Sequence, residues 1–218
     1  MFTGIITEQG SVESLVLNPA KDSAVLTIKA GEAIADLELG GSLAVNGVCL
    51  TAVESKPGVV SVDVMGETLT RTTTGELKAG ASANLERCVP AGGRMDGHVV
   101  QGHVDGVGAL LERENMGDWE RLRFSVPLQL ARYIAEKGSI AIDGVSLTVT
   151  TVSPVDAEDA YFEVGLIPTT LAETNLGAKA AGDKVNLEVD VLAKYAERLL
   201  AFSQADKAAA RHVAGAHS

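Results

Sequence analysis

Aromatic residues are scarce in this chain of 218 residues, at 4% of the sequence, and there are only two cysteines, Cys49 and Cys88. With so few large rings, the volume of any core must come from Val, Leu, Ile and Ala. Two cysteines are too few for the disulfide framework of a small secreted domain. The apolar share of 46% nevertheless excludes a disordered chain and suffices for one large core or two small ones.

Positive charge is also in short supply, with 18 basic against 29 acidic residues and a net charge of −11. Such a chain binds phosphate backbones poorly and is repelled by anionic membrane surfaces, so neither nucleic acid nor a membrane is an expected partner. The N-terminus has no basic stretch followed by a long apolar one, and the sequence has no apolar run of about 18 residues. A soluble cytoplasmic protein is therefore expected.

What the sequence does contain is an internal duplication. Residues 41–51 (GSLAVNGVCLT) and 138–148 (GSIAIDGVSLT) agree at seven of eleven positions, and residues 68–86 and 170–188 agree at nine of nineteen. The two shifts are 97 and 102 residues, which places five additional residues in the second copy, near the acidic turn at 154–159. A period this long does not fit a solenoid, whose repeats are about 20–45 residues, but does fit two complete domains.

The expected domains are residues 1–97 and 98–189, packed against each other because no Ser/Pro/Gly-rich linker separates them. Short stretches of alternating apolar and polar residues, such as 60–64 and 145–150, predict strands with one wet and one buried face. Glycines between the strands suit a small closed barrel or a sandwich in each copy. Short helices are predicted at about 32–39 and 127–137, before the two GS strands.

A helix that belongs to neither copy is predicted for residues 190–203. Asp190 can cap its N-terminus, and Val191, Leu192, Tyr195 and Leu199 share one apolar face. That face could cover a barrel or form a contact between subunits, and the pattern alone does not choose between these two roles. The tail at 204–218, rich in Ala, Lys and His, is expected to fray and to be disordered.

Strand periodicity places candidate chemical groups in each copy. Cys49 and Thr51 share one face of their strand, and Ser146 and Thr148 share the corresponding face in the second copy. The apolar residues between them would fill the core. Each copy therefore presents a small polar face at matching positions. The alternative interpretation is ordinary solvent-facing Ser and Thr, which is the rule in antiparallel sheets.

Matched positions of the two copies differ in their titratable groups. The pairs are Cys49 and Ser146, Asn46 and Asp143, and Ile5 and His103. Two similar pockets with different acid–base groups can hold two copies of one molecule in different roles. Drift after duplication also accounts for the differences and, from the residues alone, is preferred. His98 and His103 are five residues apart, on opposite faces of a strand, so a shared metal ion is not expected.

Several motifs in combination resemble the riboflavin synthase family of the alpha-chain type. They are MFTGI at the N-terminus, NGVCLT at 46–51, the run from GH at 97–98 to GHVDG at 102–106, DGVSLT at 143–148, and LIPTTL at 166–171. The resemblance covers residues 1 to about 202, including the order of the motifs and the duplication. It implies a mainly β fold of two tandem Greek-key barrels of the six-stranded type, followed by an α-helix that helps to assemble a homotrimer.

The reaction implied by the resemblance is a dismutation of two molecules of 6,7-dimethyl-8-ribityllumazine. A four-carbon unit passes from one molecule to the other, which gives riboflavin and 5-amino-6-(ribitylamino)uracil in the last step of riboflavin biosynthesis. No cofactor and no metal is expected. Each active site would lie between the N-terminal barrel of one subunit and the C-terminal barrel of a neighbour, and lumazine synthase is a candidate partner.

The resemblance also implies four catalytic residues and two substrate pockets. His103 and Asp143 would move protons, and Ser42 and Cys49 would orient or polarise the ring. The first pocket would be lined by Phe2, Thr3, Gly4, Ile5, Ile6, Ser42, Cys49, Leu50, Thr51, Asp63, Val64, Met65, Gly66, Glu67 and Thr68. The second pocket would be lined by Gly102, His103, Val104, Lys137, Ser146, Leu147, Thr148, Gly165, Leu166, Ile167, Pro168, Thr169 and Thr170.

Two other functions are open at this point. Relatives of the same fold bind one lumazine or flavin as a fluorescent antenna without turning it over, and these have lost parts of one pocket. A duplicated barrel could also serve only as an interaction module. Both pockets keep their polar residues in this chain, which favours the enzyme.

Overall fold

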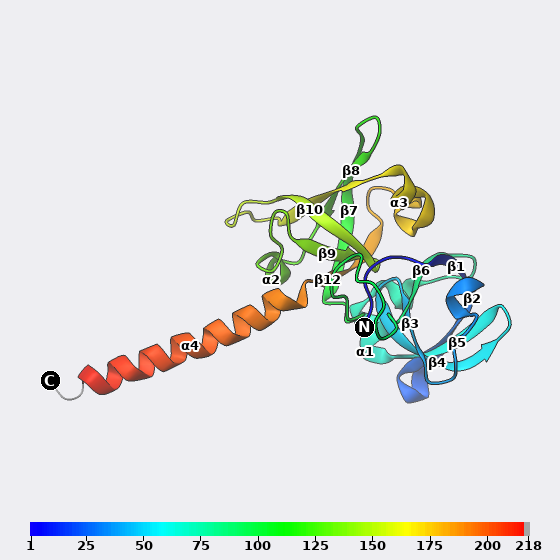
Figure 1. The fold of residues 1–218 in the computed structure, drawn as a ribbon, viewed down its shortest axis with the longest axis horizontal. Helices are drawn as coiled ribbons and strands as arrows, with labels where there is room; N and C mark the ends of the chain where they lie inside the picture. Colours follow the sequence, from blue (N-terminus) through cyan, green and yellow to red (C-terminus); the bar gives the residue numbers. More distant parts are fainter. Residues whose placement is uncertain (216–218) are drawn as a thin grey trace.

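A computed structural model describes the backbone of residues 1–215 and the side-chain surroundings of residues 1–203. The chain forms two closed six-stranded antiparallel barrels followed by one long helix, α4 (Val191–Gly215) (Figure 1). The strands of the first barrel are β1 (Glu8–Asn18), β2 (Ser23–Lys29), β3 (Ser42–Val45), β4 (Val48–Lys56), β5 (Val59–Met65) and β6 (Ser82–Arg87). The strands of the second barrel are β7 (Gly106–Asn115), β8 (Glu120–Ser125), β9 (Ser139–Ile142), β10 (Val145–Val152), β11 (Tyr161–Leu166) and β12 (Lys184–Val189).

The duplication of the sequence is also a duplication of the topology. Around the first barrel the strands follow the order β1-β2-β5-β4-β3-β6, and around the second they follow the matching order β7-β8-β11-β10-β9-β12. Register shifts occur at matching places, in β1 and β7 and in β4 and β10. Such bulges bend and twist a strand, which helps a short sheet to close on itself. The sequence left open whether each copy forms a barrel or a sandwich, and the structure shows that both form barrels.

The additional residues of the second copy lie where the sequence predicted them. Residues 153–160 join β10 to β11, whereas only residues 57–58 join β4 to β5. An insertion in an exposed hairpin loop leaves the barrel intact, because the strands on either side keep their pairing.

Each barrel has its own core. The core of the first barrel is aliphatic, as the composition predicted, with Leu26, Leu43 and Leu85 fully buried. The core of the second barrel also contains Phe124 and Phe162, whose ring centroids are 5.7 Å apart. The few aromatic residues are thus concentrated in one barrel, which the composition alone did not indicate.

The helices within the barrels are shorter than predicted. The segment at 32–39 forms only a 3-10 turn at Glu32–Ile34, and the segment at 127–137 forms only α2 (Leu128–Ala131). Both continue as successive turns with hydrogen bonds between residues three apart. Segments of this length are marginal as helices, because nucleation is costly below about 12 residues. Two further α-helices lie within the barrel domains. They are α1 (Gly66–Arg71), which follows β5, and α3 (Pro168–Glu173), which follows β11.

The C-terminal helix is longer than predicted. The backbone of α4 is helical to Gly215, whereas the predicted helix ended at 203 and the tail was expected to be disordered. Ala, Lys, Gln and Arg have high helix propensity, which explains continuation through this stretch. Asp190 caps the helix as predicted, since its Oδ1 accepts a hydrogen bond from the backbone N–H of Leu192 at 3.0 Å. Residues 216–218 of the predicted tail lie outside the described residues.

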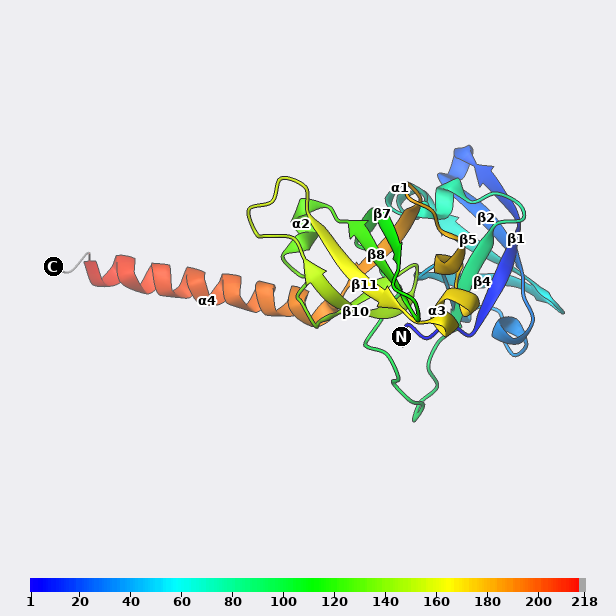
Figure 2. The ribbon, with the colours of Figure 1, turned by 90° about the horizontal axis from the view of Figure 1, so that it is seen from above.

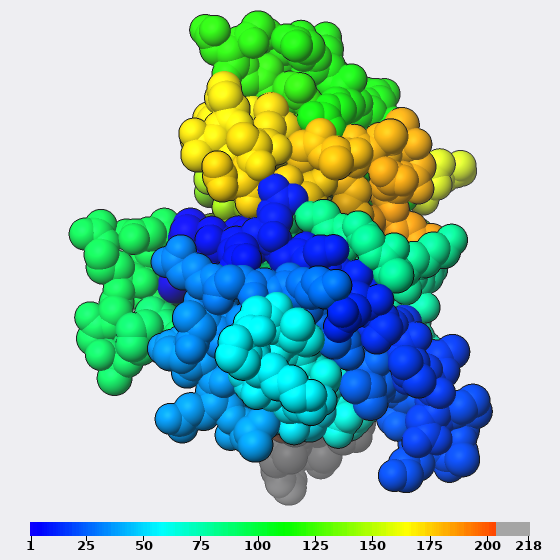
Figure 3. Space-filling model, turned by 90° about the vertical axis from the view of Figure 1, so that its right-hand side faces the viewer, coloured from blue at the N-terminus to red at the C-terminus, as the bar shows by residue number. Residues whose placement is uncertain are grey.

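The two barrels are in direct contact, and α4 projects away from both (Figure 2). The N-terminal segment runs along the seam between the barrels, where it appears in dark blue in Figure 3. None of the helices in the described part of the chain is both long and apolar enough to cross a membrane.

Candidate active site

Two short segments cross from one barrel to the other at the seam. The segment before β1 and the segment before β7 pair with each other through Phe2 and Val100, whose backbone N–H and C=O groups exchange hydrogen bonds of 2.7 and 3.1 Å. Phe2 is fully buried there, against Ala44 and Ala141 at matching positions of the two barrels. Phe2 therefore anchors the seam rather than an open pocket.

Beyond this pair, each segment reaches a strand of the opposite barrel. The backbone N–H of Cys49 donates to the carbonyl of Gly102 at 2.8 Å, and the N–H of Ser146 donates to the carbonyl of Gly4 at 2.8 Å. The predicted grouping of the pockets is therefore wrong. Gly4 lies with Ser146 of the second barrel, and Gly102 lies with Cys49 of the first.

Both contacts require glycine. Gly4 and Gly102 each have φ of +79°, a conformation that side chains disfavour. A Cβ on Gly4 would lie 2.5 Å from the Cβ of Ser146, and a Cβ on Gly102 would lie 2.5 Å from the Cβ of Cys49. The backbone of each segment thus lies directly against the candidate chemical group of the other barrel.

A buried carboxylate holds each crossing segment in place. Glu188 accepts backbone N–H groups of Gln101 at 2.6 Å and of Gly102 and His103 at 2.9 Å each. Glu86, at the matching position of the first barrel, accepts the N–H groups of Thr3 and Gly4 at 2.6 and 3.0 Å.

Burial raises the pKa of both carboxyl groups, and these hydrogen bonds oppose the rise. Neither residue was predicted from the sequence. The available signal was the Asn-Leu-Glu shared by the two copies, which places an acid inside a barrel strand.

The crossing segment and the first barrel enclose a pocket of about 380 Å³. Its walls come from the start of β4, from α1, and from the segment that leads into β7. The lining residues are Val48, Cys49, Glu67, Thr68, Arg71, Thr72, Gly102, His103, Val104 and Asp105. The pocket brings the predicted residues Cys49 and His103 together from different halves of the chain. Four of its lining residues were not predicted for the site, namely Val48, Arg71, Thr72 and Asp105.

The outer face of the first barrel extends this pocket. Pairing in the sheet places Ser42 opposite Thr51, and Thr51 opposite Asp63, on the same face as Cys49. Thr51, Asp63 and Met65 are exposed. The predicted residues Leu50 and Val64 instead point into the barrel core, because they occupy the alternate strand positions.

The corresponding face of the second barrel carries Ser146 and Thr148 on β10 and Gly165 on β11. The exposed residues Ile167, Pro168 and Thr169 continue from β11 into α3, and the exposed Ile5 follows Gly4, whose carbonyl accepts the N–H of Ser146. Lys137 is exposed at the turn before β9. Leu166 is fully buried in the core, and Ile6 and Leu147 pack against that core. These three predicted residues therefore belong to the core beneath this face and not to its surface.

The pocket at Cys49 is called the first site here, and the polar face around Ser146 the second site. His98 belongs to the second site. Its Nδ1 lies 2.7 Å from the Oγ of Ser146, and its buried Nε2 has no hydrogen-bond partner within the described residues. The first site has the exposed His103 near Cys49, so each site contains one imidazole and one small nucleophilic side chain. His98 is absent from the residues predicted for either pocket. Within the described part of the chain, no group of three His, Cys, Asp or Glu side chains could hold a metal ion.

Burial lowers the pKa of His98, and the charge of Asp190 acts in the opposite direction. Between the folded pKa and the ordinary value of about 6.5, the unfolded chain binds a proton that the folded chain does not. The contribution of His98 to stability is therefore present at neutral pH and is lost as the pH falls.

We expect the free energy of unfolding to fall more from about pH 7.5 to about pH 5.5 in the wild type than in His98→Gln. The difference is on the order of 1 kcal/mol for each unit of pKa displacement, and urea unfolding at the two pH values measures it. The buried carboxyls of Glu86, Glu188 and Asp143 titrate with the opposite sign but are common to both proteins. An equal or smaller fall in the wild type contradicts the prediction.

Asp143 does not join the pocket. Its side chain has no exposed surface and lies between the barrels, whereas His103 is exposed in the pocket. The Asp143 carboxylate accepts the backbone N–H of Asn186 at 2.7 Å and the side-chain amide of Asn175 at 2.9 Å. The structure therefore separates the two residues that the resemblance grouped as proton carriers.

Comparison with known proteins agrees with this architecture. A family model described as the lumazine binding domain matches residues 3–88 and 101–190, one match in each barrel. Two solved structures of LumP share the fold. LumP complexed with riboflavin is 27% identical with a TM-score of 0.77, and LumP complexed with 6,7-dimethyl-8-(1'-D-ribityl) lumazine is 25% identical with a TM-score of 0.75. Each comparison covers 87% of this chain and 99% of LumP.

Curated relatives are more similar in sequence. Riboflavin synthase of Mycobacterium tuberculosis (strain H37Rv form) is 50% identical over 204 residues, 92% of this chain and 98% of the relative. Riboflavin synthase of Actinobacillus pleuropneumoniae is 46% identical over 95% of this chain and 93% of its own length, and that of Bacillus subtilis is 40% identical over 92% and 90%. The chain belongs to the riboflavin synthase family and carries two copies of its lumazine-binding domain.

Proposed function

We propose that this enzyme is a transferase that converts two molecules of 6,7-dimethyl-8-ribityllumazine into riboflavin and 5-amino-6-(ribitylamino)uracil. The observation that carries the proposal is the pair of matched sites with different groups. One site has Cys49 and His103, and the other has Ser146 and His98. A reaction that uses one heterocycle as both donor and acceptor of a four-carbon unit needs two similar pockets in two chemical roles.

The substrate supplies much of the chemistry. The methyl group at C7 of the lumazine is acidic, because its anion delocalises into the pyrimidinedione ring. Holding two such rings together provides a large acceleration through proximity, with effective molarities of about 10⁵ M or more. The protein then has to move protons and to stabilise a nucleophile at C7. His103 at the mouth of the first pocket is placed to exchange protons with a bound ring, and Cys49 is placed to contact it.

The proposal is tested by incubating the purified protein with 6,7-dimethyl-8-ribityllumazine alone and following riboflavin formation. We expect turnover in the wild type and a loss of about 100-fold in His103→Gln, with lumazine still bound, because general acid–base catalysis contributes about this much. Tight binding without product would indicate an antenna-type protein that binds lumazine without turning it over. Neither binding nor product would indicate an interaction module.

We also propose a homotrimer assembled through α4. The helix projects from the barrels (Figure 1), and Leu192, Tyr195 and Leu199 on one face are 66%, 60% and 72% exposed. Exposed apolar stripes of this kind mark contacts between subunits. Lys194 of α4 bonds to Asp105 at 2.8 Å, and Asp105 lines the first pocket, so the helix is connected to the site. Location in the cytoplasm and association with lumazine synthase are further predictions.

Charge on the apolar face of α4 is expected to dissociate the assembly. In Leu192→Glu/Leu199→Glu, carboxylates replace two exposed leucines, and burying them in a contact between subunits is unfavourable. We expect light scattering to change from the mass of a trimer to that of a monomer. Ala201→Glu, on the opposite face of the helix, is the control and should leave the mass unchanged. A wild-type protein that is already monomeric would contradict the proposed trimer.

A further inference from the structure

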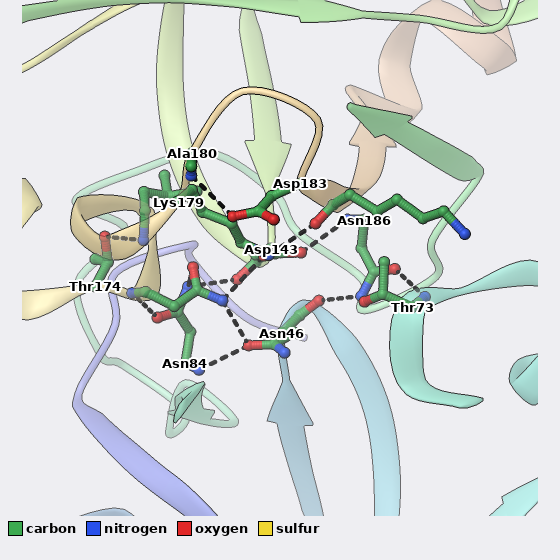
Figure 4. Close-up of polar contacts among 12 residues, drawn as sticks. Asn46, Thr73, Asn84, Asp143, Thr174, Lys179, Ala180, Asp183 and Asn186 are labelled. Atoms are coloured by element: carbon green, nitrogen blue, oxygen red, sulfur yellow. Dashed lines mark hydrogen bonds and ion pairs between the residues drawn. The ribbon is translucent and has the colours of Figure 1, made fainter. Parts of the chain in front are cut away.

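The seam between the barrels contains a reciprocal set of hydrogen bonds, which we call the joint (Figure 4). Asn84 in β6 and Asn186 in β12 occupy matching positions. The side-chain carbonyl of Asn84 accepts the backbone N–H of Asn175 at 2.7 Å, and its amide donates to the backbone carbonyl of Asp143 at 2.9 Å. Asn186 does the same in the opposite direction, with the N–H of Thr73 at 2.8 Å and the carbonyl of Asn46 at 2.9 Å.

Three matched positions break this symmetry. Asn46, Thr73 and Leu77 in the first barrel correspond to Asp143, Asn175 and Lys179 in the second. The Asp143 carboxylate accepts hydrogen bonds from the backbone N–H of Asn186 and the side-chain amide of Asn175, and it lies 3.3 Å from the Nζ of Lys179. The three replacements therefore form one contact group, in which the carboxylate faces two side-chain donors, from Asn175 and Lys179, in addition to a backbone N–H like the one that Asn46 accepts from Asn84.

The chemistry of this group requires a carboxylate at position 143. All three groups facing its oxygens are donors, and a carboxylate is purely an acceptor. An asparagine there would direct an N–H group at Lys179, a pure donor, or at the amide of Asn175, whose carbonyl already accepts from Asn84 at 3.0 Å. Burial raises the pKa of Asp143, and the charge of Lys179 and the hydrogen bonds act to lower it. Lys179, whose side chain is 20% exposed, thus compensates for burying the acid.

The joint is close to both sites along the chain. Asn46-Gly47 and Asp143-Gly144 form the tight turns before β4 and β10, and all four residues have positive φ. The two turns touch, since a Cβ on Gly47 would lie 2.7 Å from the backbone nitrogen of Gly144. Cys49 and Ser146, which hold the crossing segments, follow three residues after Asn46 and Asp143. A shift at the joint therefore moves both strand starts relative to the segments they bind.

We propose that Asp143 and Lys179 are positioning residues, which set the orientation of the two barrels and thereby the placement of Cys49 against Gly102 and of Ser146 against Gly4. Asp143 moves no proton in the reaction. The inference rests on the proposed function, because the effect on the sites is measured through riboflavin formation. It assigns Asp143 a role different from the one that the resemblance implied.

The first barrel supplies the residues for a matched test. In Asp143→Asn, measured at a temperature where circular dichroism shows a folded protein, we expect kcat to fall about tenfold and KM to change less than threefold. The triple variant Asp143→Asn/Asn175→Thr/Lys179→Leu copies the residues of the first barrel into the second. We expect it to recover kcat to within about threefold of wild type, with an unchanged pH–rate profile. Lys184→Met is the control. It removes an exposed lysine side chain that pairs with Glu76, and it should have no effect on kcat.

Two results overturn the proposal. Full kcat in a folded Asp143→Asn would show that the group is merely structural. A folded triple variant that stays inactive, or that loses one limb of the pH–rate profile, would show that the Asp143 carboxylate itself takes part in proton transfer. If the triple variant does not fold, Lys179→Arg and Lys179→Met decide. The proposal requires the arginine variant to keep turnover and the methionine variant to lose at least fivefold, and equal turnover overturns it.

The two proposals, on the function and on the joint, can fail separately. A wild type that forms no riboflavin contradicts the function but leaves the thermodynamic coupling measurable. A double-mutant cycle of Asp143→Asn and Lys179→Leu by urea unfolding should then show non-additive changes, since the two side chains are in contact. Additive changes would overturn the proposal for Asp143 and Lys179, whatever the activity of the enzyme.

Discussion

Gly102→Ala reduces riboflavin formation by about 100-fold, if the crossing segment is what completes the first pocket. An alanine Cβ would lie 2.5 Å from the Cβ and 2.8 Å from the backbone nitrogen of Cys49, at a φ of +79°. The crossing segment has to move away from β4. This breaks the hydrogen bond that Cys49 donates to Gly102, and it displaces His103, the next residue of the segment. A displacement of about 1 Å from a productive geometry costs on the order of 100-fold in rate.

Gly40→Ala is the matched control for this experiment. Gly40 has nearly the same backbone conformation, with φ of +81°, but nothing lies within 4 Å of the position of its Cβ. It therefore carries the same conformational strain, about 1 kcal/mol, without the collision. We expect turnover in Gly40→Ala to remain within about twofold of wild type. Equal losses in the two variants would mean that strain, not the approach of the segment to Cys49, limits activity.

Glu188→Ala is expected to have the second large effect, on both stability and turnover. Its carboxylate accepts three consecutive backbone N–H groups, from Gln101, Gly102 and His103. Removing it leaves these donors without a partner at a cost of about 1–3 kcal/mol each where they stay buried. We expect a loss of at least about 3 kcal/mol in the free energy of unfolding by urea, and turnover reduced at least about tenfold.

Hydrogen exchange separates this local effect from a general one. The amides of residues 101–103 should lose protection in Glu188→Ala, while the core strands exchange as in the wild type at low denaturant. Glu188→Gln keeps one acceptor oxygen and should be intermediate. Glu76→Ala, which removes an exposed carboxylate paired with Lys184, is the control and should change stability by less than about 1 kcal/mol. Unchanged exchange at residues 101–103 would contradict the anchoring role of Glu188.

Some features of the fold could be predicted because they depend on local pattern. Alternation in β4 and β10 correctly placed Cys49 and Ser146 on the outside and Val48 and Val145 inside, since side chains of a strand alternate between faces. The duplication predicted two barrels, and the change of shift located the longer loop at 153–160. The cap at Asp190 is equally local.

The grouping of residues into sites could not be predicted in the same way. Cys49 and His103 were both candidates, but they were assigned to different pockets, because position in a repeat was taken as position in a barrel. The structure brings them together through the crossing of two segments, which no periodicity records. Glu86 and Glu188 were missed for a related reason, since each binds backbone groups distant along the chain.

By itself the sequence determined two similar β domains, the polar face of each and the apolar stripe of the last helix, since these follow from side-chain spacing along a single segment. Only the tertiary structure decided that the crossing segments exchange partners and that Asp143 lies in the joint. The physical reason is that backbone hydrogen bonds and close glycine contacts between remote segments depend on relative orientation, and residue types constrain that orientation only after both barrels have formed.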